Sequence, residues 1–432
     1  MNKQKRRIVT LYRSISILLF STLLVLGCFI GALFFIRPSQ SANEKRTLTT
    51  FPSFSLSSFL DGSYFSQIST WYADTYPGRD TWISLNTKVK DHYGIQSETM
   101  IVGGQAKSDE IPTESKTTTK KKKKAEVPEQ SLMQEEMQNK IMQGMYVDNG
   151  AAYGAYYFNQ EAADTYIQGI NDSAKKLSKT TTVYSVLVPN NILVLDKDVQ
   201  EKIGGSNQEK AIDYYMNSYS DSVKGVDVYS RLEKHKDEYL YFRTDHHWTA
   251  LGAYYAYLEF CDVKGIKAHS LSYFEKQKST PFLGSYYAEL QLEEMADNPD
   301  TVIAYIPKGT NDMKFWRDGQ EYDGKVVTPQ DYWDENSQYM QFIQGDQPLV
   351  KITNKKIKDG SSCVVLKESY GNCFVPFLVD HYETVYVMDF RYTEEVPKDF
   401  CKKNKIDDLI VINNIQIIAS TSVAEVIGDM IS

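Results

Sequence analysis

From residue 145 onward, short apolar runs alternate with amphipathic stretches. Continuous apolar runs are typical of strands that are buried on both faces. They predict strands at 182–188, 226–229, 239–242, 363–366, 384–388 and 409–412. Helical periodicity predicts helices at 207–223, 250–262 and 372–380. Because strands and helices alternate, we expect an α/β fold in which a parallel sheet is flanked by helices.

Two parts of the chain depart from this alternation. Residues 285–345 are acidic and rich in turn-forming residues, so we expect an insertion that lies over the sheet. Nearer the N-terminus, apolar side chains at helical spacing predict a short helix around 65–72, and Pro77-Gly78 would end it. A second helix is predicted from 79 to about 92.

Residues 14–36 form an uncharged, mostly apolar stretch that is long enough to span a bilayer as one helix. Five cationic residues and no acidic residue precede it: Lys3, Lys5, Arg6, Arg7 and Arg13. Because such residues stay in the cytoplasm, we expect a single-pass protein of the plasma membrane whose remaining chain is extracytoplasmic. A cleaved signal peptide, or a lipoprotein signal around Cys28, is the alternative, although Arg37-Pro38-Ser39-Gln40 is a poor cleavage context.

Residues 105–130 combine Ser, Thr, Glu and Pro with an unbroken run of lysines at 120–124. Such a stretch cannot bury a core, so we expect a disordered, solvated insertion, with contact to an anionic lipid or wall polymer as the alternative. The predicted organisation is a cytoplasmic tail (1–13), a transmembrane anchor (14–36), a leading segment of the exported part (37–104), the Lys/Thr-rich insertion (105–130) and a main α/β domain (131–432).

Composition narrows the classes of function. The chain has 48 Lys and Arg against 56 Asp and Glu, a net charge of −8, and this balance argues against a nucleic-acid binder. Four cysteines follow the predicted anchor: Cys261, Cys363, Cys373 and Cys401. Export permits disulfides, but the spacing fixes no pairing and matches no zinc or haem pattern.

The first chemically suggestive segment is TDHHWT at 244–249, between a predicted strand and a helix that Thr249 would cap. In an extended chain, Asp245 and His247 share one face and His246 points the opposite way, with Trp248 packed behind. A carboxylate that orients an imidazole is half of a nucleophilic triad. A metal site is the alternative, but no third histidine accompanies the pair at ligand spacing.

The second segment is KESYGN at 367–372, which follows the predicted strand 363–366. A serine at this strand-to-helix turn, Ser369, would lie at the carboxyl end of a parallel sheet, where ligands bind. Backbone N–H groups at the start of the next helix can bind an oxyanion. The arrangement resembles a nucleophile elbow without the GxSxG spacing, and a simple helix cap is the alternative.

Taken together, TDHHWT, KESYGNCFVPFL and the strings FPSF, DGSYF and YPGRDTW resemble the DHHW family of exported bacterial proteins. That family is similar to the alginate O-acetyltransferase group, whose catalytic domains are SGNH-hydrolase-like. The resemblance covers about 44–100 and 145–415. It implies an SGNH-hydrolase-like fold for 131–432, with Ser369 as nucleophile and His247 and Asp245 as base and acid.

The same resemblance suggests further roles. Tyr370 and Asn372 would orient the oxyanion or the substrate, and His246 and Trp248 would support the motif. Glu368 stands where many relatives have Asp. The implied activity is extracytoplasmic O-acylation, chiefly O-acetylation, of a surface polysaccharide, without a metal or cofactor and with a membrane-bound O-acyltransferase as partner. The alternatives are a carbohydrate esterase and a non-catalytic surface-assembly or glycan-binding protein on the same fold.

Overall fold

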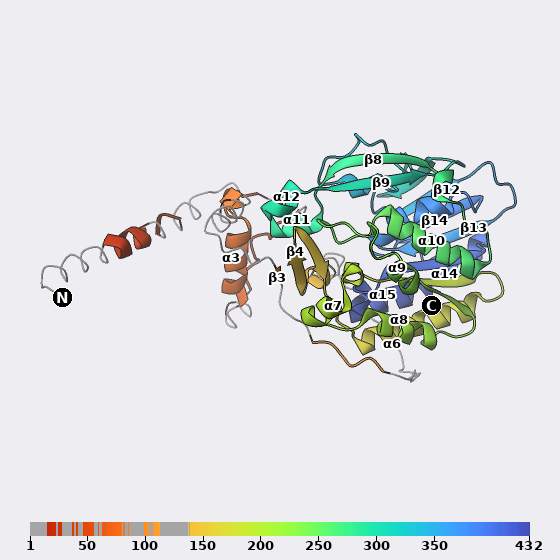
Figure 1. Cartoon of the computed structure of the whole chain (residues 1–432), viewed down its shortest axis with the longest axis horizontal. Coiled ribbons are helices and arrows are strands. Elements are labelled where there is room, and N and C mark those ends of the chain that lie inside the picture. Colours follow the sequence, from red (N-terminus) through yellow and green to blue (C-terminus); the bar gives the residue numbers. More distant parts are fainter. Residues whose placement is uncertain are drawn as a thin grey trace, which may run out of the picture. The chain divides into compact units, whose positions relative to one another are not determined.

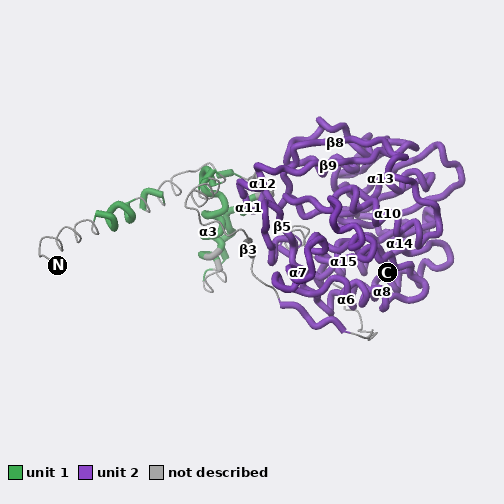
Figure 2. Tube along the Cα trace, in the orientation of Figure 1, with its two compact units in different colours: residues 1–96 green, residues 97–432 purple. Residues whose placement is uncertain are grey.

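The computed structural model describes residues 139–432 without a gap, together with residues 15–22, 25–27, 37–38, 40–41, 46–55, 59, 63–79, 81–82, 85, 99–102, 107–112 and 137. The chain divides into two compact units, residues 1–96 and 97–432 (Figure 2). Most of the predicted helix 79–92 and of the predicted insertion 105–130 lies outside the described residues.

The first unit contains the helix α3 (Ser63–Asp74), which confirms the helix predicted around 65–72, and the short strands β1 (Gln40–Ser41) and β2 (Arg46–Thr47). Across the parts of the chain that the structure describes, no helix combines the length and the hydrophobicity that crossing a membrane requires. Residues 14, 23–24 and 28–36 of the predicted anchor are outside those parts.

A large sheet organises the second unit, with the strand order β11-β10-β12-β14-β13-β15-β6-β7 (Figure 1). Five neighbouring strands are parallel: β14 (Thr384–Asp389), β13 (Ser362–Lys367), β15 (Asp408–Asn414), β6 (Thr182–Val188) and β7 (Val223–Asp227). The strands β12 (Leu349–Thr353), β10 (Asp312–Arg317) and β11 (Gln320–Lys325) extend the sheet in antiparallel fashion beyond β14. The predicted α/β fold is therefore confirmed, but the sheet is mixed: its parallel part is extended by three antiparallel strands.

Every residue of β13 and β15 is buried, which explains the continuous apolar runs at 363–366 and 409–412 within them: helices cover both faces of these strands. In one layer, α6 (Gln160–Leu177) packs against α15 (Thr421–Ile431) and α14 (Pro397–Asn404). In the other, α10 (Ala250–Lys264) packs against α9 (Tyr229–Glu233) and α13 (Val375–Leu378). A Cβ on Gly169 would come within 2.5 Å of the Gly428 Cα, so the close approach of α6 and α15 depends on these glycines.

Smaller elements surround this core. The strands β3 (Thr99–Val102), β4 (Met145–Asp148) and β5 (Ala151–Gly154) form an antiparallel sheet, and β8 (Glu275–Phe282) pairs with β9 (Asp300–Ile306). Further α-helices of this unit are α7 (Lys197–Ile203), α8 (Gln208–Ser218), α11 (Ser285–Leu290) and α12 (Glu293–Asp297). The cysteines Cys261, Cys363, Cys373 and Cys401 are buried free thiols.

Some predicted boundaries were wrong. The stretch 239–242 is not a strand, because only Tyr241 pairs, in a single bridge to Trp248. The helix predicted at 207–223 ends at Ser218, since β7 begins at Val223. Residues 285–345 do not simply lie over the sheet: they supply β10 and β11 to its edge.

Candidate active site

Asp245, His247 and Ser369 form one chain of hydrogen bonds. His247 Nδ1 lies 2.6 Å from Asp245 Oδ1, and His247 Nε2 lies 2.7 Å from Ser369 Oγ. Ser369 comes directly after β13 and Glu368, whereas the other two residues precede α10 by several residues. The fold thus brings together the three residues that the two sequence segments pointed to, although 122 positions separate His247 from Ser369.

The serine loop is fixed by the Glu368 carboxylate. Its Oε2 accepts a hydrogen bond from the Tyr370 N–H at 2.8 Å and lies 3.3 Å from Ser369 Oγ, while its Oε1 accepts from the Asn414 N–H at 2.9 Å. Burial raises the pKa of Glu368, against the effect of the two backbone N–H groups. The carboxylate therefore ties the loop after β13 to the end of β15.

The histidine loop is held in a similar way by Asp245. Its Oδ1 also accepts the backbone N–H of His247 at 2.9 Å, and its Oδ2 accepts the Ser285 N–H at 2.8 Å. Burial alone would raise the pKa of Asp245, but the charge and hydrogen bond of His247, with His246 and the Ser285 N–H, hold it well below its usual range. Asp245 is therefore an ionised carboxylate that fixes the orientation of the imidazole.

A glycine allows this approach of Ser285 to Asp245. A Cβ on Gly284 would lie 2.1 Å from the Asp245 Cβ and 2.3 Å from its Oδ2. Real side chains do not come so close, so any larger residue at 284 would push the two segments apart. Neither Gly284 nor Ser285 was singled out by the sequence analysis, because nothing in a Gly-Ser pair forty residues away marks it as part of the motif.

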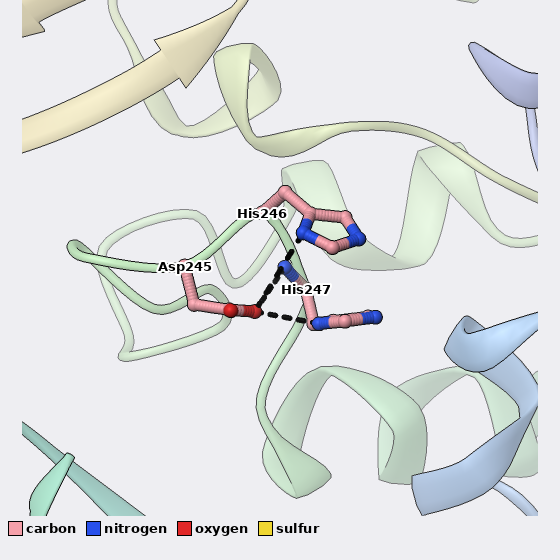
Figure 3. Close-up of side chains that lie close together, drawn as sticks. All are labelled: Asp245, His246 and His247. Atoms are coloured by element: carbon pink, nitrogen blue, oxygen red, sulfur yellow. Dashed lines mark hydrogen bonds and ion pairs between the residues drawn. The ribbon is translucent and has the colours of Figure 1, made fainter. Parts of the chain in front are cut away.

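His246 does not point away from its neighbour, as the predicted extended chain would require. The ring centroids of His246 and His247 are only 3.7 Å apart. Figure 3 shows both rings on the same side of Asp245, with the outer nitrogen of each directed away from that residue. The prediction was wrong because residues 243–247 bend, as the Asp245 side chain accepts the His247 backbone N–H.

Aromatic side chains enclose the imidazole of His247. Tyr339, in the 285–345 segment, stacks on His247 and donates its hydroxyl to the Ser369 carbonyl at 2.9 Å. Trp248 is completely buried and donates its Nε1–H to the Tyr370 carbonyl at 2.9 Å. The Tyr370 hydroxyl in turn donates to the His246 carbonyl, so hydrogen bonds connect the two segments in both directions.

These groups open onto a cleft of about 270 Å³. It lies where the parallel strands end, because β13, β14 and β15 deliver the residues that follow them to the same edge of the sheet. Polar and apolar side chains line it: Met137, Ile141, His246, His247, Asp346, Glu368, Ser369, Tyr370, Arg391, Tyr392, Asn414, Gln416 and Ile417.

A buried ion network forms part of the cleft wall. Lys367 lies 2.9 Å from Asp346 and 2.7 Å from Asp389, and Arg391 contacts the same two carboxylates at 2.8 and 2.6 Å. Although burial would raise the pKa of Asp346, the charges of Arg391 and Lys367 hold it well below its usual range. The network fixes the ends of β13 and β14 relative to each other.

The two residues expected to orient an oxyanion are already engaged. The Tyr370 N–H donates to Glu368, and the Asn372 side-chain amide donates to Asp346 at 2.9 Å. Asn414, which the sequence analysis missed, is better placed. Its Oδ1 accepts the Gln416 N–H at 2.9 Å, which leaves Nδ2 buried, without a hydrogen-bond partner among the described residues, in a residue that lines the cleft.

Asp245, His246 and His247 are also the group that could hold a metal ion within the described part of the chain, since one ligand atom from each lies within 4.8 Å of the others. The Nδ1 atom of each histidine already has a hydrogen-bond partner. His247 Nδ1 bonds to Asp245 and His246 Nδ1 bonds to Ser285 Oγ, at 2.6 and 2.7 Å. A metal bound through Nδ1 would break both bonds, so the geometry fits a triad better than a metal centre.

Several solved structures have a fold similar to that of this chain. A DHHW family protein from Eubacterium siraeum matches with a TM-score of 0.59 and 28% identity over 66% of this chain and 94% of that chain. Bacillus cereus PatB1 matches with a TM-score of 0.56 and 18% identity over 65% and 98%. PatB1 with a sulfonyl adduct matches with a TM-score of 0.53 and 17% identity over 62% and 93%.

The O-acetyltransferase domain of Pseudomonas putida AlgJ also matches, with 12% identity over 61% of this chain and 89% of that chain, but its TM-score of 0.34 is too low to carry an argument. No curated protein sequence matches the chain. The family model described as DHHW protein matches residues 44–126 and 131–388, which is most of the sequence. The chain therefore belongs to the DHHW family.

Proposed function

We propose that this protein is an O-acyltransferase of the cell envelope, on an SGNH-hydrolase-like domain, that transfers an acyl group, chiefly acetyl, to a surface polysaccharide. The observation that carries the proposal is the hydrogen-bond chain from Asp245 through His247 to Ser369, with distances of 2.6 and 2.7 Å. A serine within hydrogen-bond reach of an oriented imidazole is the arrangement that nucleophilic catalysis requires. It favours an enzyme over the non-catalytic binding protein on the same fold.

In the first half-reaction, Ser369 Oγ attacks the carbonyl carbon of the acyl donor while its proton passes to His247 Nε2. The tetrahedral intermediate collapses, the bond to the leaving group breaks, and His247 returns the proton to that group. Asp245 stabilises the imidazolium that forms in between. Asn414 Nδ2 is the candidate donor to the oxyanion, because a buried donor without a partner is already desolvated and oriented.

In the second half-reaction, a hydroxyl of the acceptor attacks the acyl carbon of the Ser369 ester. His247 Nε2 takes the hydroxyl proton, the bond between the acyl carbon and Ser369 Oγ breaks, and the proton returns to Ser369. With a sugar hydroxyl the outcome is transfer, and with water it is hydrolysis. The esterase alternative therefore uses the same residues and differs only in the acceptor.

The family resemblance and the N-terminal sequence together motivate the proposed location. An uncharged stretch at 14–36 behind five cationic residues fits a single anchor in the plasma membrane with the active site outside. Such a position would place the cleft beside the envelope polysaccharide and a membrane-bound O-acyltransferase that supplies acyl groups. A reporter fused after Ser432 should then be active only outside the cytoplasm, and cytoplasmic activity would contradict the proposal.

The catalytic proposal is tested by trapping the acyl-enzyme. The purified full-length chain is mixed with 4-nitrophenyl acetate, quenched in acid and analysed by mass spectrometry. We expect one added acetyl group, mapped to the peptide that contains Ser369. Ser369→Ala should abolish the label, whereas Ser272→Ala, at an exposed serine outside the cleft, should retain it. A label that persists in the folded Ser369→Ala variant would remove Ser369 from the mechanism.

A second reagent tests the same nucleophile independently. Sulfonyl fluorides react with activated serines and leave a stable sulfonyl ester, and one structure of B. cereus PatB1 carries a sulfonyl adduct. Phenylmethylsulfonyl fluoride should therefore modify Ser369 and block later acetylation by 4-nitrophenyl acetate. Acetylation that proceeds unchanged after full sulfonylation at another residue would contradict the proposed site.

A further inference from the structure

His246 presents a fixed hydrogen-bond donor to the cleft beside the catalytic histidine. Its backbone N–H lies 3.2 Å from Ser285 Oγ, and its Nδ1 lies 2.7 Å from the same oxygen. Because Ser285 Oγ accepts the backbone N–H, its own hydroxyl proton is free to donate to His246 Nδ1. An imidazole that accepts at Nδ1 and is neutral carries its proton on Nε2.

The surroundings keep this ring neutral. Burial, followed by the neighbouring charge of His247, lowers the pKa of His246 to about 3. Asp245, Asp346 and Arg391 also act on it, and their effects differ in sign. Over the pH range in which His247 works as a base, His246 is thus an uncharged N–H donor and takes no proton from the reaction.

The outer nitrogens of the two rings point the same way. His247 Nε2 faces Ser369, and Figure 3 shows the His246 ring beside it with its outer nitrogen on the same side. His246 also lines the cleft, and the Tyr370 hydroxyl holds its carbonyl in place. A hydroxyl that approaches His247 Nε2 to lose its proton therefore also comes near the Nε2–H of His246. Because that nitrogen already carries a proton, it cannot take the proton of the hydroxyl.

We propose that His246 is an acceptor-positioning residue: its Nε2–H binds an oxygen next to the hydroxyl that attacks the acyl-enzyme. The ligand class that fits is a vicinal diol, as on a sugar ring, because it offers one hydroxyl to His247 and a neighbouring oxygen to His246. This inference rests on the proposed function and deepens it, since it gives the site a reason to prefer a sugar over water.

The proposed binding changes no bond in the reaction. The attacking hydroxyl gives its proton to His247, forms the new ester bond to the acyl carbon and releases Ser369 Oγ, to which His247 returns the proton. His246 keeps its proton throughout. Its loss should therefore leave formation of the Ser369 acyl-enzyme unchanged and weaken only the step that depends on the acceptor.

The tautomer can be observed without any activity. In the full-length chain labelled with ¹⁵N-histidine, we expect His246 to show a protonated Nε2 and an unprotonated Nδ1 at neutral pH. Ser285→Ala removes the hydroxyl that selects this tautomer and should shift both nitrogen signals. A protonated Nδ1 in the unmodified protein would overturn the proposal, because Nε2 would then be an acceptor.

The acceptor preference is tested with the acetyl-enzyme preformed from 4-nitrophenyl acetate. Transfer to trans-1,2-cyclohexanediol is compared with transfer to cyclohexanol, which lacks the neighbouring oxygen. We expect the diol to be favoured about tenfold, the effect of one hydrogen bond of ordinary strength. His246→Ala should erase that preference through the acceptor KM, and His246→Gln, which keeps an N–H donor, should restore part of it.

The controls separate the two hypotheses. His235→Ala, at a histidine that stacks on Tyr255 away from the cleft, should behave as the unmodified protein. If the acyl-enzyme forms but the diol preference is absent, or survives in His246→Ala, the role of His246 is refuted and the proposed function stands. If no acyl-enzyme forms at Ser369, the proposed function falls and the role of His246 falls with it.

Discussion

The ring of Tyr339 lies flat against the imidazole of His247, with centroids 3.9 Å apart and planes 12° apart, while its hydroxyl donates to the Ser369 carbonyl. One side chain thus contacts both His247, the proposed base, and Ser369, the proposed nucleophile. It comes from the 3₁₀ turn at Gln338–Gln341, inside the segment expected to be an insertion. This segment is therefore part of the candidate active site.

Two substitutions at Tyr339 should separate its contributions. Tyr339→Phe keeps the stacking and loses one hydrogen bond of about 1 kcal/mol, so acetylation of Ser369 should slow by less than about tenfold. Tyr339→Ala removes the ring, should slow acetylation further, and should lower the free energy of unfolding by about 3 kcal/mol or more. Stopped-flow release of 4-nitrophenol and chemical denaturation measure the two effects. Tyr332→Phe, at an exposed tyrosine of the same segment, is the matched control.

Gly284→Ala should uncouple Asp245 from the triad. The added Cβ would collide with the Asp245 Cβ and Oδ2, so the Ser285 N–H could no longer reach that carboxylate. Because an unsupported imidazole is a poor base, we expect acetylation of Ser369 to fall by about 100-fold or more.

Gly265→Ala is the informative comparison for Gly284→Ala. Gly265 has open space around its Cα but a φ of +75°, so alanine there should cost about 1 kcal/mol of stability through strain alone. At matched folded fraction, that variant should acetylate normally. Equal acetylation rates in the two glycine variants would show that the Gly284 contact does not support the triad.

The sequence was a good guide where local pattern determines structure. The run TVYSVLV predicted β6 at its observed bounds, because a strand buried on both faces must be apolar throughout. Thr249 caps α10 as expected, its hydroxyl accepting the Gly252 N–H. Ser369 stood out because it follows a buried strand, where parallel strands deliver functional side chains. Asp245 and His247 stood out because a carboxylate two residues from an imidazole can orient it.

Contacts between distant segments were beyond the reach of such patterns. Tyr339 and Gly284 have no neighbours in sequence that mark them, and only the folded chain brings them to His247 and Asp245. The bend that turns His246 toward the cleft arises from a hydrogen bond between Asp245 and the His247 backbone, which overrides the extended conformation that was assumed. Asn414 could have been found, since it ends a buried strand beside the one that precedes Ser369.

Asn414→Ala tests the proposed oxyanion donor. The substitution removes Nδ2 but keeps the backbone N–H that donates to Glu368, so the serine loop should remain in place. Loss of one such donor typically lowers the rate by about 10²–10³-fold, and we expect that effect on acetylation of Ser369. Asn413→Ala is the matched control. Its side chain bonds to Tyr166 in the core and does not line the cleft, so this variant should lose stability and retain its rate. Similar rates in both variants would exclude Asn414 as the donor.

The neutral state of His246 should be visible in the pH dependence of stability. Its pKa is lowered from 6.5 to about 3 by burial and by His247. Between these two values the unfolded chain binds a proton that the folded chain does not, so the group destabilises the fold as the pH falls from 6.5 toward 3. The slope for one such group approaches about 1.4 kcal/mol per pH unit.

His246→Gln should therefore flatten the fall in the free energy of unfolding between about pH 6 and pH 4, as measured by urea denaturation at a series of pH values. His381→Gln should act in the same direction outside the cleft, because burial and His269 lower the pKa of His381 to about 4.

The pH dependence of the acetylation rate tests whether His246 shares the role of the proposed base, His247. Since His246 stays neutral in the working range, His246→Gln should leave the acid limb of the pH–rate profile where it is. A shift of that limb would mean that His246 titrates together with His247 and is more than a neutral donor.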